Sequence, residues 1–580
     1  MCIRDSQHAT REEGRGPLYL VAEKILERGE TLPRSWAVSG TTGYDFLAAS
    51  GGLLVDPDGE AALTRLHADM AATDLRWDEV VRRSKLDVMD GSFASEIHVL
   101  SHGLKRIADR DRHARDFTLA SLRRVIQETV AAFPVYRTYV RPDGTREKDD
   151  ERHVRAAVAR ARRHNPGIEP SIFAFIERVL LLLDRSDEAV RFTMRFQQLT
   201  GPIMAKGVED TALYRYTRLI CLDEVGCDPE RFGTSIQDFH AHNAATLAEW
   251  PLTMTATSTH DTKRGEDVRA RVAVLSEISG EWGAFVRALH AATQRFGTML
   301  DGVFAPSPTD AHLLYQTLVG AIPFEGVTNE FVQRVGAYAK KAAREARVHT
   351  SWTSPDERYE NALEDFVQGV LGDDEIRGRV EAFARRVAPH GATNSLAITA
   401  LKLASPGVPD TYQGCEIWDL SLVDPDNRRP VDFESRRRML ADLRGRGAPT
   451  PELARELLAH YEDGRIKLHV THVGLHMRRE SPSLFIEGAY APVEGSPHVV
   501  AFERTLRDRR LVCVVPRLSA KITRDACRWP VGDVWKGQSL RLGAGGRFRN
   551  VFTGETLEGA ELPMASVFGV LPVAWLEQLR

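Results

Sequence analysis

Two side chains able to do acid–base chemistry, His260 and Asp261, stand together just after a strand-like stretch. Residues 251–257 alternate apolar and β-branched polar side chains with a period of two, which predicts a strand. A carboxylate at the carboxyl end of a strand is how a (β/α)8 barrel builds an active site. The alternative is a helix N-terminus, where Asp261 caps free amide groups while Lys263 and Arg264 lie in water. Both interpretations stay open from this stretch alone.

A second carboxylate, Glu23, ends a shorter apolar run. Residues 17–22 are typical of a strand buried on both faces in a parallel sheet. Glu23 is either paired with its neighbour Lys24 or placed in a cleft with a raised pKa, as a general acid requires. Downstream, residues 39–46 form a Gly/Thr-rich turn that carries the aromatic ring of Tyr44, and such a turn is able to place a ring for stacking on a sugar.

Two further segments concentrate polar and aromatic groups. For any single side chain of residues 201–216, surface ion pairing is the simpler explanation. As a group they suit the wall of a polyol-binding pocket, which needs a few convergent polar groups on aromatic walls. The candidates on this wall are Lys206, Glu209, Asp210, Tyr214 and Arg215. The prolines and glycines of residues 405–416 exclude a regular helix and predict a tightly shaped loop that includes Tyr412 and Glu416.

The elements that must position these groups follow from hydrophobic periodicity. Residues 57–200 show helical spacing, and apolar stripes of this kind are typical of core packing. We therefore expect a helical insertion packed against a barrel. Within it, residues 133–139 form an aromatic, arginine-bearing loop that is able to face a ligand. From about residue 497 the period returns to two, and residues 499–502 and 510–515 predict strands of a small antiparallel module.

Composition narrows the class of protein. The chain has 580 residues, of which 43% are hydrophobic and 27% charged, and a formal net charge of −4. This is an ordinary globular composition with no basic surface for nucleic acid and no apolar run of membrane-spanning length. Six cysteines in so long a chain make neither a disulfide framework nor a metal-binding pattern, which fits a reducing cytoplasm. We expect no nucleic acid, no membrane, no metal and no cofactor.

The order of these motifs resembles the glycoside hydrolase clan that includes α-amylase and, more specifically, the malto-oligosyltrehalose synthase family. A strand ending in Glu is followed by a strand ending in His-Asp, a Pro-Gly-Val-Pro loop and a β module. The matching segments run nearly end to end and lie at residues 21–26, 40–45, 133–137, 204–211, 258–264, 349–352 and 419–430. A chance match of so many segments in the family's order is implausible.

The resemblance implies roles for these residues. Glu23 corresponds to the general acid/base, and Asp261 to the carboxylate that grips sugar hydroxyls, with His260 beside it. The implied substrate contacts are the wall residues Lys206, Glu209, Asp210, Tyr214 and Arg215, together with Arg264, Tyr44, Tyr412 and Glu416. Leu213 departs from the family, where we expect an aromatic ring. Retention of configuration also needs a carboxylate nucleophile roughly 5 Å from the acid, and in the family this aspartate lies in an Arg-x-Asp-His segment.

No such segment occurs in this sequence. We therefore expect that the chain lacks the first four barrel strands and is inactive by itself, with residues 1–6 an artefact of the gene sequence. The resemblance implies a partial (β/α)8 barrel holding strands 5–8, a large helical insertion and a C-terminal antiparallel β-sandwich. The expected boundaries are a barrel segment at 1–56, the insertion at 57–200, further barrel strands at 201–480 and the β domain at 481–580.

The implied reaction is an intramolecular transglucosylation. The reducing-end α-1,4 linkage of a malto-oligosaccharide becomes an α,α-1,1 linkage, which yields a trehalosyl end and requires a closed site that retains glucose. The implied pathway partner is malto-oligosyltrehalose trehalohydrolase. Two alternatives remain: an α-glucan hydrolase or 4-α-glucanotransferase of the same clan, and a glucan-binding protein without catalysis.

Overall fold

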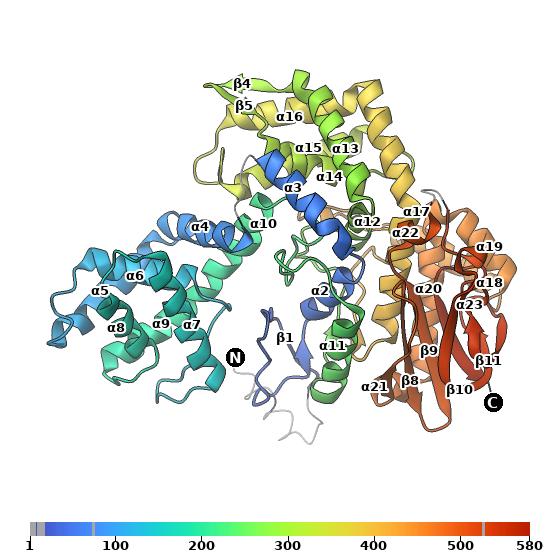
Figure 1. Cartoon of the computed structure of the whole chain (residues 1–580), viewed down its shortest axis with the longest axis horizontal. Helices are drawn as coiled ribbons and strands as arrows, with labels where there is room; N and C mark the ends of the chain where they lie inside the picture. The colour runs from blue at the N-terminus through green and yellow to red at the C-terminus, as the bar shows by residue number, and fades with distance from the viewer. Residues whose placement is uncertain (1–6, 8–17, 72–75, 525–527, 580) are drawn as a thin grey trace.

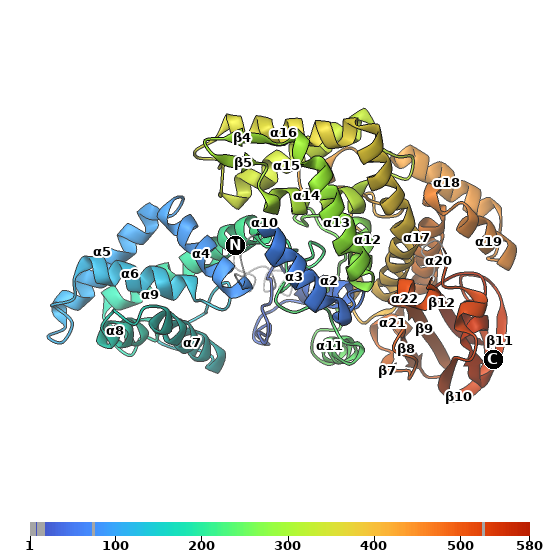
Figure 2. The ribbon, with the colours of Figure 1, turned by 45° about the horizontal axis from the view of Figure 1, so that its top comes forward.

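The computed structural model describes residues 7, 18–71, 76–524 and 528–579 of the chain. Three lobes surround a centre that contains β1, α2 and α11: a helical block, a second group of helices, and a C-terminal sheet with its own helices (Figure 1). The same three lobes are separate after the molecule is turned (Figure 2). The expectations for residues 1–6, for the strand start at Pro17, and for Cys2 and Cys527 lie outside the described residues.

Four very short parallel strands lie at the centre. β1 (Val21–Ala22) pairs with β2 (Gly40–Thr41), and β3 (Met254–Thr255) pairs with β6 (Val408–Pro409). The backbone N–H of Thr41 donates to Thr253 Oγ1 at 2.9 Å, so the two pairs are neighbours. The strands predicted at residues 17–22 and 251–257 are therefore present but shorter than expected. Their carboxyl ends lead directly to Glu23 and to the segment that holds Asp261.

The helical block has a hydrophobic core of its own, as the apolar stripes predict. Ile97 and Leu104 on one helix and Leu122 and Ile126 on the next are fully buried within it. The helices of the block are α4 (Trp77–Asp90), α5 (Ala94–Arg110), α6 (Leu119–Ala131), α7 (Lys148–His164), α8 (Pro170–Leu180) and α9 (Asp187–Met204). This core is separate from that of the centre, and a small hydrophobic cluster that includes Trp77 and Val80 of α4 joins the block to residues 212–216.

Helices around the centre share a second core. They are α3 (Glu60–Ala71), α12 (Glu266–Glu277), α13 (Ser279–Thr293), α14 (Pro308–Ala321), α15 (Asn329–Ala346), α16 (Glu357–Gly372) and α17 (Asp374–Ala404), with a small hairpin of β4 (Thr298–Leu300) and β5 (Val303–Ala305). By contrast, α2 (Tyr44–Gly52) and α11 (Ile236–Glu249) contribute Phe46 and Phe239 to a third core that includes the C-terminal part. The helix α12 follows the His260–Asp261 segment and is buried along nearly its whole length, so it fixes that segment to the core. Within the described part of the chain, no helix is long and apolar enough to cross a membrane.

The C-terminal part forms one antiparallel sheet of six strands. The order is β11-β10-β12-β9-β8-β7, with β7 (Ala489–Pro492), β8 (Val499–Leu506), β9 (Arg509–Pro516), β10 (Ser539–Asn550), β11 (Thr556–Pro563) and β12 (Ala574–Leu579). The two predicted strands are confirmed as parts of β8 and β9. The expected β-sandwich is wrong for the described residues, because their C-terminal strands form one sheet and not two. Both faces of this sheet are buried. One face packs on α17 and α20 (Arg465–Glu480) rather than on a second sheet.

Candidate active site

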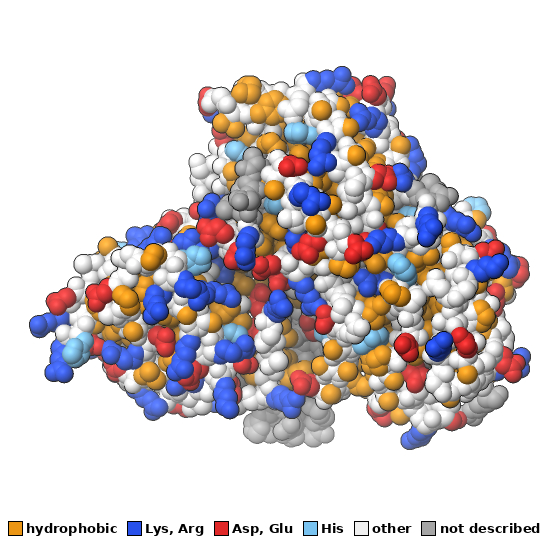
Figure 3. Space-filling view, viewed as in Figure 1, with side chains coloured by type: hydrophobic (Ala, Val, Ile, Leu, Met, Phe, Trp, Pro, Cys, Tyr) orange, Lys and Arg blue, Asp and Glu red, His pale blue; other side chains and the backbone are white. Residues whose placement is uncertain are grey.

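Glu23, His260 and Asp261 lie together although the first two are 237 positions apart in the sequence. One side-chain oxygen or nitrogen of each lies within 4.8 Å of the others, and all three residues are exposed. His260 Nε2 is 3.4 Å from Asp261 Oδ2. The convergence follows from the parallel strands, whose carboxyl ends meet at one edge of the centre. Asp and Glu side chains gather where the helical block meets this part of the molecule (Figure 3).

The loop that carries Asp261 is held from behind by a buried carboxylate. Glu224 is 1% exposed, and it accepts the backbone N–H of Lys263 at 2.7 Å and of Arg264 at 3.2 Å. From the opposite side, Asn427 Nδ2 donates to the carbonyl of His260 at 3.0 Å. Backbone groups fixed at several points hold a side chain in a defined place, which a catalytic carboxylate needs.

The polar wall predicted from residues 201–216 contains a π-helical segment, η2 (Ala205–Ala212), which continues α9 and carries Glu209 near Asp261. Such segments are rare and often mark functional sites. Lys206 and Asp210 form an ion pair at 2.6 Å, and Lys263 Nζ reaches Asp210 Oδ1 at 2.9 Å. Gly207 packs so closely on Lys85 that a Cβ there would lie 2.7 Å from its Cγ. The sequence predicted polar groups on this wall but not their π-helical backbone.

Burial and neighbouring charges shift the pKa values of Glu209 and Asp210 in opposite directions. Burial raises the pKa of Glu209 to about 8, because Asp210 and Asp261 add to the effect and Lys263 only partly opposes it. Burial acts in the same direction on Asp210, but the ammonium groups of Lys263 and Lys206 outweigh it and hold the pKa of Asp210 below its usual range. At neutral pH the wall therefore presents a protonated carboxyl beside an ionised one.

Two tyrosines from distant segments support the loop. The hydroxyl of Tyr44 lies 3.1 Å from Thr259 Oγ1, but its ring is only 3% exposed. Tyr412 is half-buried and donates to the carbonyl of Asn427 at 3.2 Å. Both residues therefore lie beside the His260–Asp261 segment, and Tyr44 is positioned more to support it than to stack on a ligand.

Four of the candidate substrate contacts are buried or already paired with other groups of the protein. Arg264 is 1% exposed and donates to the carbonyls of Ile220 and Asp223, each at 3.1 Å, so the expectation that it contacts substrate is corrected: it anchors the loop. Tyr214 is 2% exposed and lies under Lys263, and it too is corrected to a supporting role.

The other two candidates are engaged elsewhere. Arg215 donates to the carbonyl of Ala346 at 2.6 Å and pairs with Asp87 at 2.7 Å. Glu416 pairs with Arg436 at 3.2 Å. Buried or paired polar groups contribute to folding instead of to an open binding surface, and spacing in a sequence does not distinguish the two uses.

Sequence reasoning missed several residues of the site. Arg428 Nη2 lies 3.9 Å from Asp261 Oδ1, and the hydroxyl of Tyr136 donates to Glu209. Both belong to segments that match the family, so the segments gave a signal even though the individual side chains did not. Glu224 carried no signal, because a buried carboxylate that binds backbone amides looks like any acid in a sequence.

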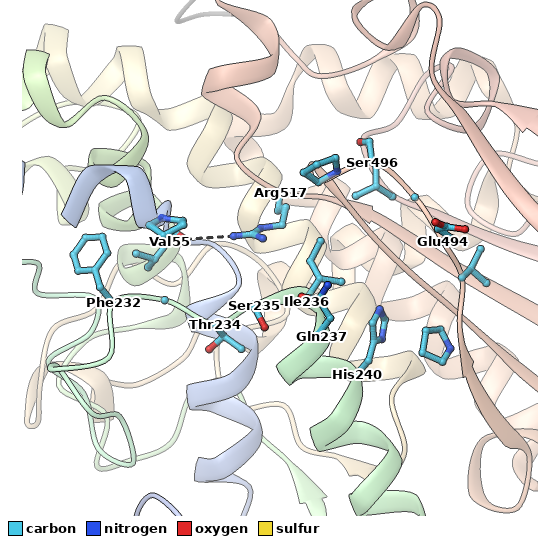
Figure 4. A pocket seen from close by; sticks show the side chains of 17 residues that line it. Val55, Phe232, Thr234, Ser235, Ile236, Gln237, His240, Glu494, Ser496 and Arg517 are labelled. Carbon is cyan, nitrogen blue, oxygen red and sulfur yellow. Dashed lines mark hydrogen bonds between the residues drawn. The ribbon is translucent and has the colours of Figure 1, made fainter. Parts of the chain in front are cut away.

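The arrangement is suited to acid–base work on an uncharged, hydroxyl-rich ligand. It provides two carboxylates, an imidazole and a wall of alternating charge. Two carboxylates and an imidazole are also able to ligate a cation, so the expectation of no metal stays a prediction. A separate cavity of about 780 Å³ lies between α11 and the start of the C-terminal sheet, lined by Ile236, Glu494 and Arg517 among others (Figure 4). This cavity does not include Glu23, His260 or Asp261, so cavity volume does not locate the candidate active site.

No protein-family model matches the chain. Among curated proteins it is 34% identical over 567 residues to a putative maltooligosyl trehalose synthase of Mycobacterium tuberculosis. That alignment covers 96% of this chain but 65% of the relative, so the chain spans about two thirds of the length of the curated relatives it matches.

Solved structures of maltooligosyltrehalose synthases are also similar to this chain. The maltooligosyltrehalose synthase of Arthrobacter ramosus superposes with a TM-score of 0.83 at 34% identity, covering 99% of this chain and 68% of that one. A hypothetical maltooligosyl trehalose synthase of Sulfolobus tokodaii superposes with a TM-score of 0.73 at 28% identity, covering 98% of this chain and 67% of that one. The similarity extends over all three lobes rather than a single motif.

Proposed function

Because the chain belongs to the maltooligosyltrehalose synthase family, we propose that its cleft serves an intramolecular transglucosylation. The substrate is a malto-oligosaccharide, and its reducing-end α-1,4 linkage becomes α,α-1,1. Glu23 protonates the glycosidic oxygen and later deprotonates the attacking hydroxyl of the retained glucose. Asp261 holds sugar hydroxyls and binds more strongly as positive charge develops on the ring, with His260 beside it.

The observation that carries this proposal is the meeting of Glu23, His260 and Asp261 at adjoining strand ends. An acid and a sugar-holding carboxylate must both reach the same ring, and atoms within 4.8 Å of one another satisfy that need. Lys206, Glu209 and Asp210 form a wall of donors and acceptors beside them. In this proposal the wall retains the released glucose long enough for it to re-attack, which distinguishes the reaction from hydrolysis.

The four parallel strands of the centre support the second half of a (β/α)8 barrel, with the helical block as an insertion and the boundaries given above. Closure of such a barrel needs further strands. The nucleophile is the remaining catalytic requirement, and the 580 residues contain no Arg-x-Asp-His segment. We therefore expect this polypeptide alone to bind and orient a glucan without forming a glycosyl-enzyme intermediate.

Product analysis tests the proposal. Maltopentaose is incubated with the complete protein encoded by the genomic reading frame, and with the 580-residue chain in parallel. We expect a non-reducing trehalosyl product from the complete protein and no turnover by the 580-residue chain. Glucose and shorter maltodextrins without a trehalosyl product would contradict the synthase reaction, and turnover by the 580-residue chain would contradict the need for a further carboxylate.

A further inference from the structure

A groove of about 690 Å³ lies between the segment after Glu23 and the helical block. One side is formed by Lys24 and residues 30–36, and the other by residues 137–153, which include the first turns of α7. The groove and the candidate active site share two segments. Lys24 directly follows Glu23, and the loop whose Tyr136 reaches Glu209 continues into Tyr139, which lines the groove. A pocket of this volume has room for more than one sugar ring.

The charges of the groove cancel. Five Lys or Arg residues and five Asp or Glu residues line it. Several of them are already paired: Lys24 with Glu30 at 2.6 Å, and Arg34 with Glu249 at 2.7 Å. A site with balanced and satisfied charges offers little to an ionic ligand, because such a ligand would have to break existing pairs. The groove therefore favours a neutral ligand that uses hydrogen bonds.

One buried polar atom in the groove is unsatisfied. His153 on α7 lines the groove and is 7% exposed, and its Nε2 has no hydrogen-bond partner within the described residues. Burial lowers the pKa of His153, so the imidazole is neutral at pH 7. Leaving a buried polar atom unpaired costs free energy. This nitrogen is itself shielded from solvent, so a ligand hydroxyl in the groove would satisfy it after a rotation of the imidazole ring.

An aromatic surface stands at the same place. Trp36 and Tyr139 meet edge to face, with ring centroids 5.1 Å apart and planes at 84°. Lys24 and Arg137 lie over the ring of Tyr139 at 5.5 and 5.1 Å, so its faces are in use. The indole of Trp36 is half-buried and is the ring left to stack on a ligand. Flat apolar faces beside hydrogen-bonding groups are what a pyranose ring requires.

We propose that this groove is a second binding site for α-1,4-glucan, in which Trp36 stacks on a glucose ring and His153 bonds to a hydroxyl. This proposal rests on the proposed function only in taking the neutral ligand to be a glucan. The occupant is either the distal part of a chain whose reducing end lies at Glu23, or a separate glucan chain. The groove thereby sets which chain lengths bind tightly.

Calorimetric titration of the 580-residue chain with maltotriose and maltoheptaose tests the proposal. We expect Trp36→Ala and His153→Ala each to weaken maltoheptaose binding about tenfold, as expected for the loss of one stacked ring or one buried hydrogen bond. Trp36→Phe keeps a ring and should restore most of the affinity. Val99→Ala removes an exposed apolar side chain from α5 in the same helical block and should have no effect.

The stoichiometry distinguishes the two occupants. One maltoheptaose per protein, with maltotriose affinity unchanged by Trp36→Ala, identifies the distal part of one chain. Two oligosaccharides per protein, with the weaker event lost in Trp36→Ala, identify a separate chain. The proposal would be overturned if folded Trp36→Ala bound both maltotriose and maltoheptaose with the same affinity and stoichiometry as the wild type. This readout needs no turnover, so it is independent of whether a trehalosyl product forms.

Discussion

The hydroxyl of Tyr136 donates a hydrogen bond to Glu209 Oε1, and this contact ties the helical block to the wall of the cleft. Tyr136 lies in the loop after α6, whereas Glu209 belongs to the π-helical turn that follows α9. The position of the block is therefore linked to a side chain whose pKa responds to the charge of Asp261. Since burial raises the pKa of Glu209 to about 8, this contact also has a protonation state that depends on pH.

Replacing Glu209 by Gln should remove a loss of stability at alkaline pH. The folded-state pKa of about 8 lies above the ordinary value of 4.5, so between these values the folded state keeps a proton that the unfolded state has lost. Stability conferred by that proton falls as pH rises through this window. Because Glu209 is partly exposed, we expect a gain of only about 1–2 kcal/mol for Glu209→Gln at pH 8.5 relative to pH 5, measured by urea unfolding.

Two further variants sharpen this measurement. Tyr136→Phe removes a donor that stabilises the ionised carboxylate, so the pKa of Glu209 should rise further and the decline in stability should extend to higher pH. Glu375→Gln changes an exposed acid on α17 and should leave the pH profile unaltered. An identical profile for Glu209→Gln and the wild type would contradict the assignment.

The two carboxylates of the candidate active site should respond differently to amide substitution. Asp261→Asn should weaken malto-oligosaccharide binding about tenfold, because a hydrogen bond to a charged acceptor is replaced by a weaker one. Glu23→Gln should change affinity less than about threefold, since a general acid acts mainly in the transition state. Titration calorimetry at pH 7 measures both. Equal losses for the two variants would argue against their separate roles, and Glu462→Gln provides a surface control.

The candidate active-site residues were easier to predict from the sequence than the structural elements between them. His260 and Asp261 follow a period-two stretch, and the stripe of Ile97 and Leu104 marks a helix, so local patterns sufficed there. The π-helical turn was not predictable, because it depends on Gly207 packing against Lys85 from another helix. The buried positions of Arg264 and Tyr214 depend equally on distant partners. A sequence lists side chains, whereas exposure is decided by tertiary packing.

A buried ion-pair cluster links the candidate active site to the C-terminal part. Lys467 on α20 is fully buried, and its Nζ lies 2.7 Å from both Glu266 Oε1 and Asp267 Oδ2 at the start of α12. Lys467→Met leaves two buried carboxylates without their cation and should destabilise the fold by about 3–5 kcal/mol. Urea unfolding checks this, with Lys536→Met at an exposed position as the control, for which we expect less than about 0.5 kcal/mol. Similar values for both variants would show that the cluster is not needed.

Gly43, the residue that precedes α2, is required by the close approach of this turn to the end of β3. Its φ is +93°, and a Cβ there would lie 2.6 Å from the backbone nitrogen of Ala256 in the segment leading to Asp261. Gly43→Ala should therefore cost about 2–4 kcal/mol of folding free energy, from the left-handed backbone and the clash together. It should also weaken glucan binding, because relief of the clash displaces that segment.

Gly51→Ala is the matched control on the adjoining helix α2. A Cβ at Gly51 meets nothing within 4 Å, and its φ is not positive. We expect it to be neutral or to stabilise the protein by up to about 1 kcal/mol, since alanine favours a helix over glycine. Denaturant unfolding and oligosaccharide titration of the two variants separate a local backbone requirement from a general intolerance of alanine in this region. If Gly43→Ala matched Gly51→Ala in both measurements, the packing of Gly43 against the strand would have no part in shaping the site.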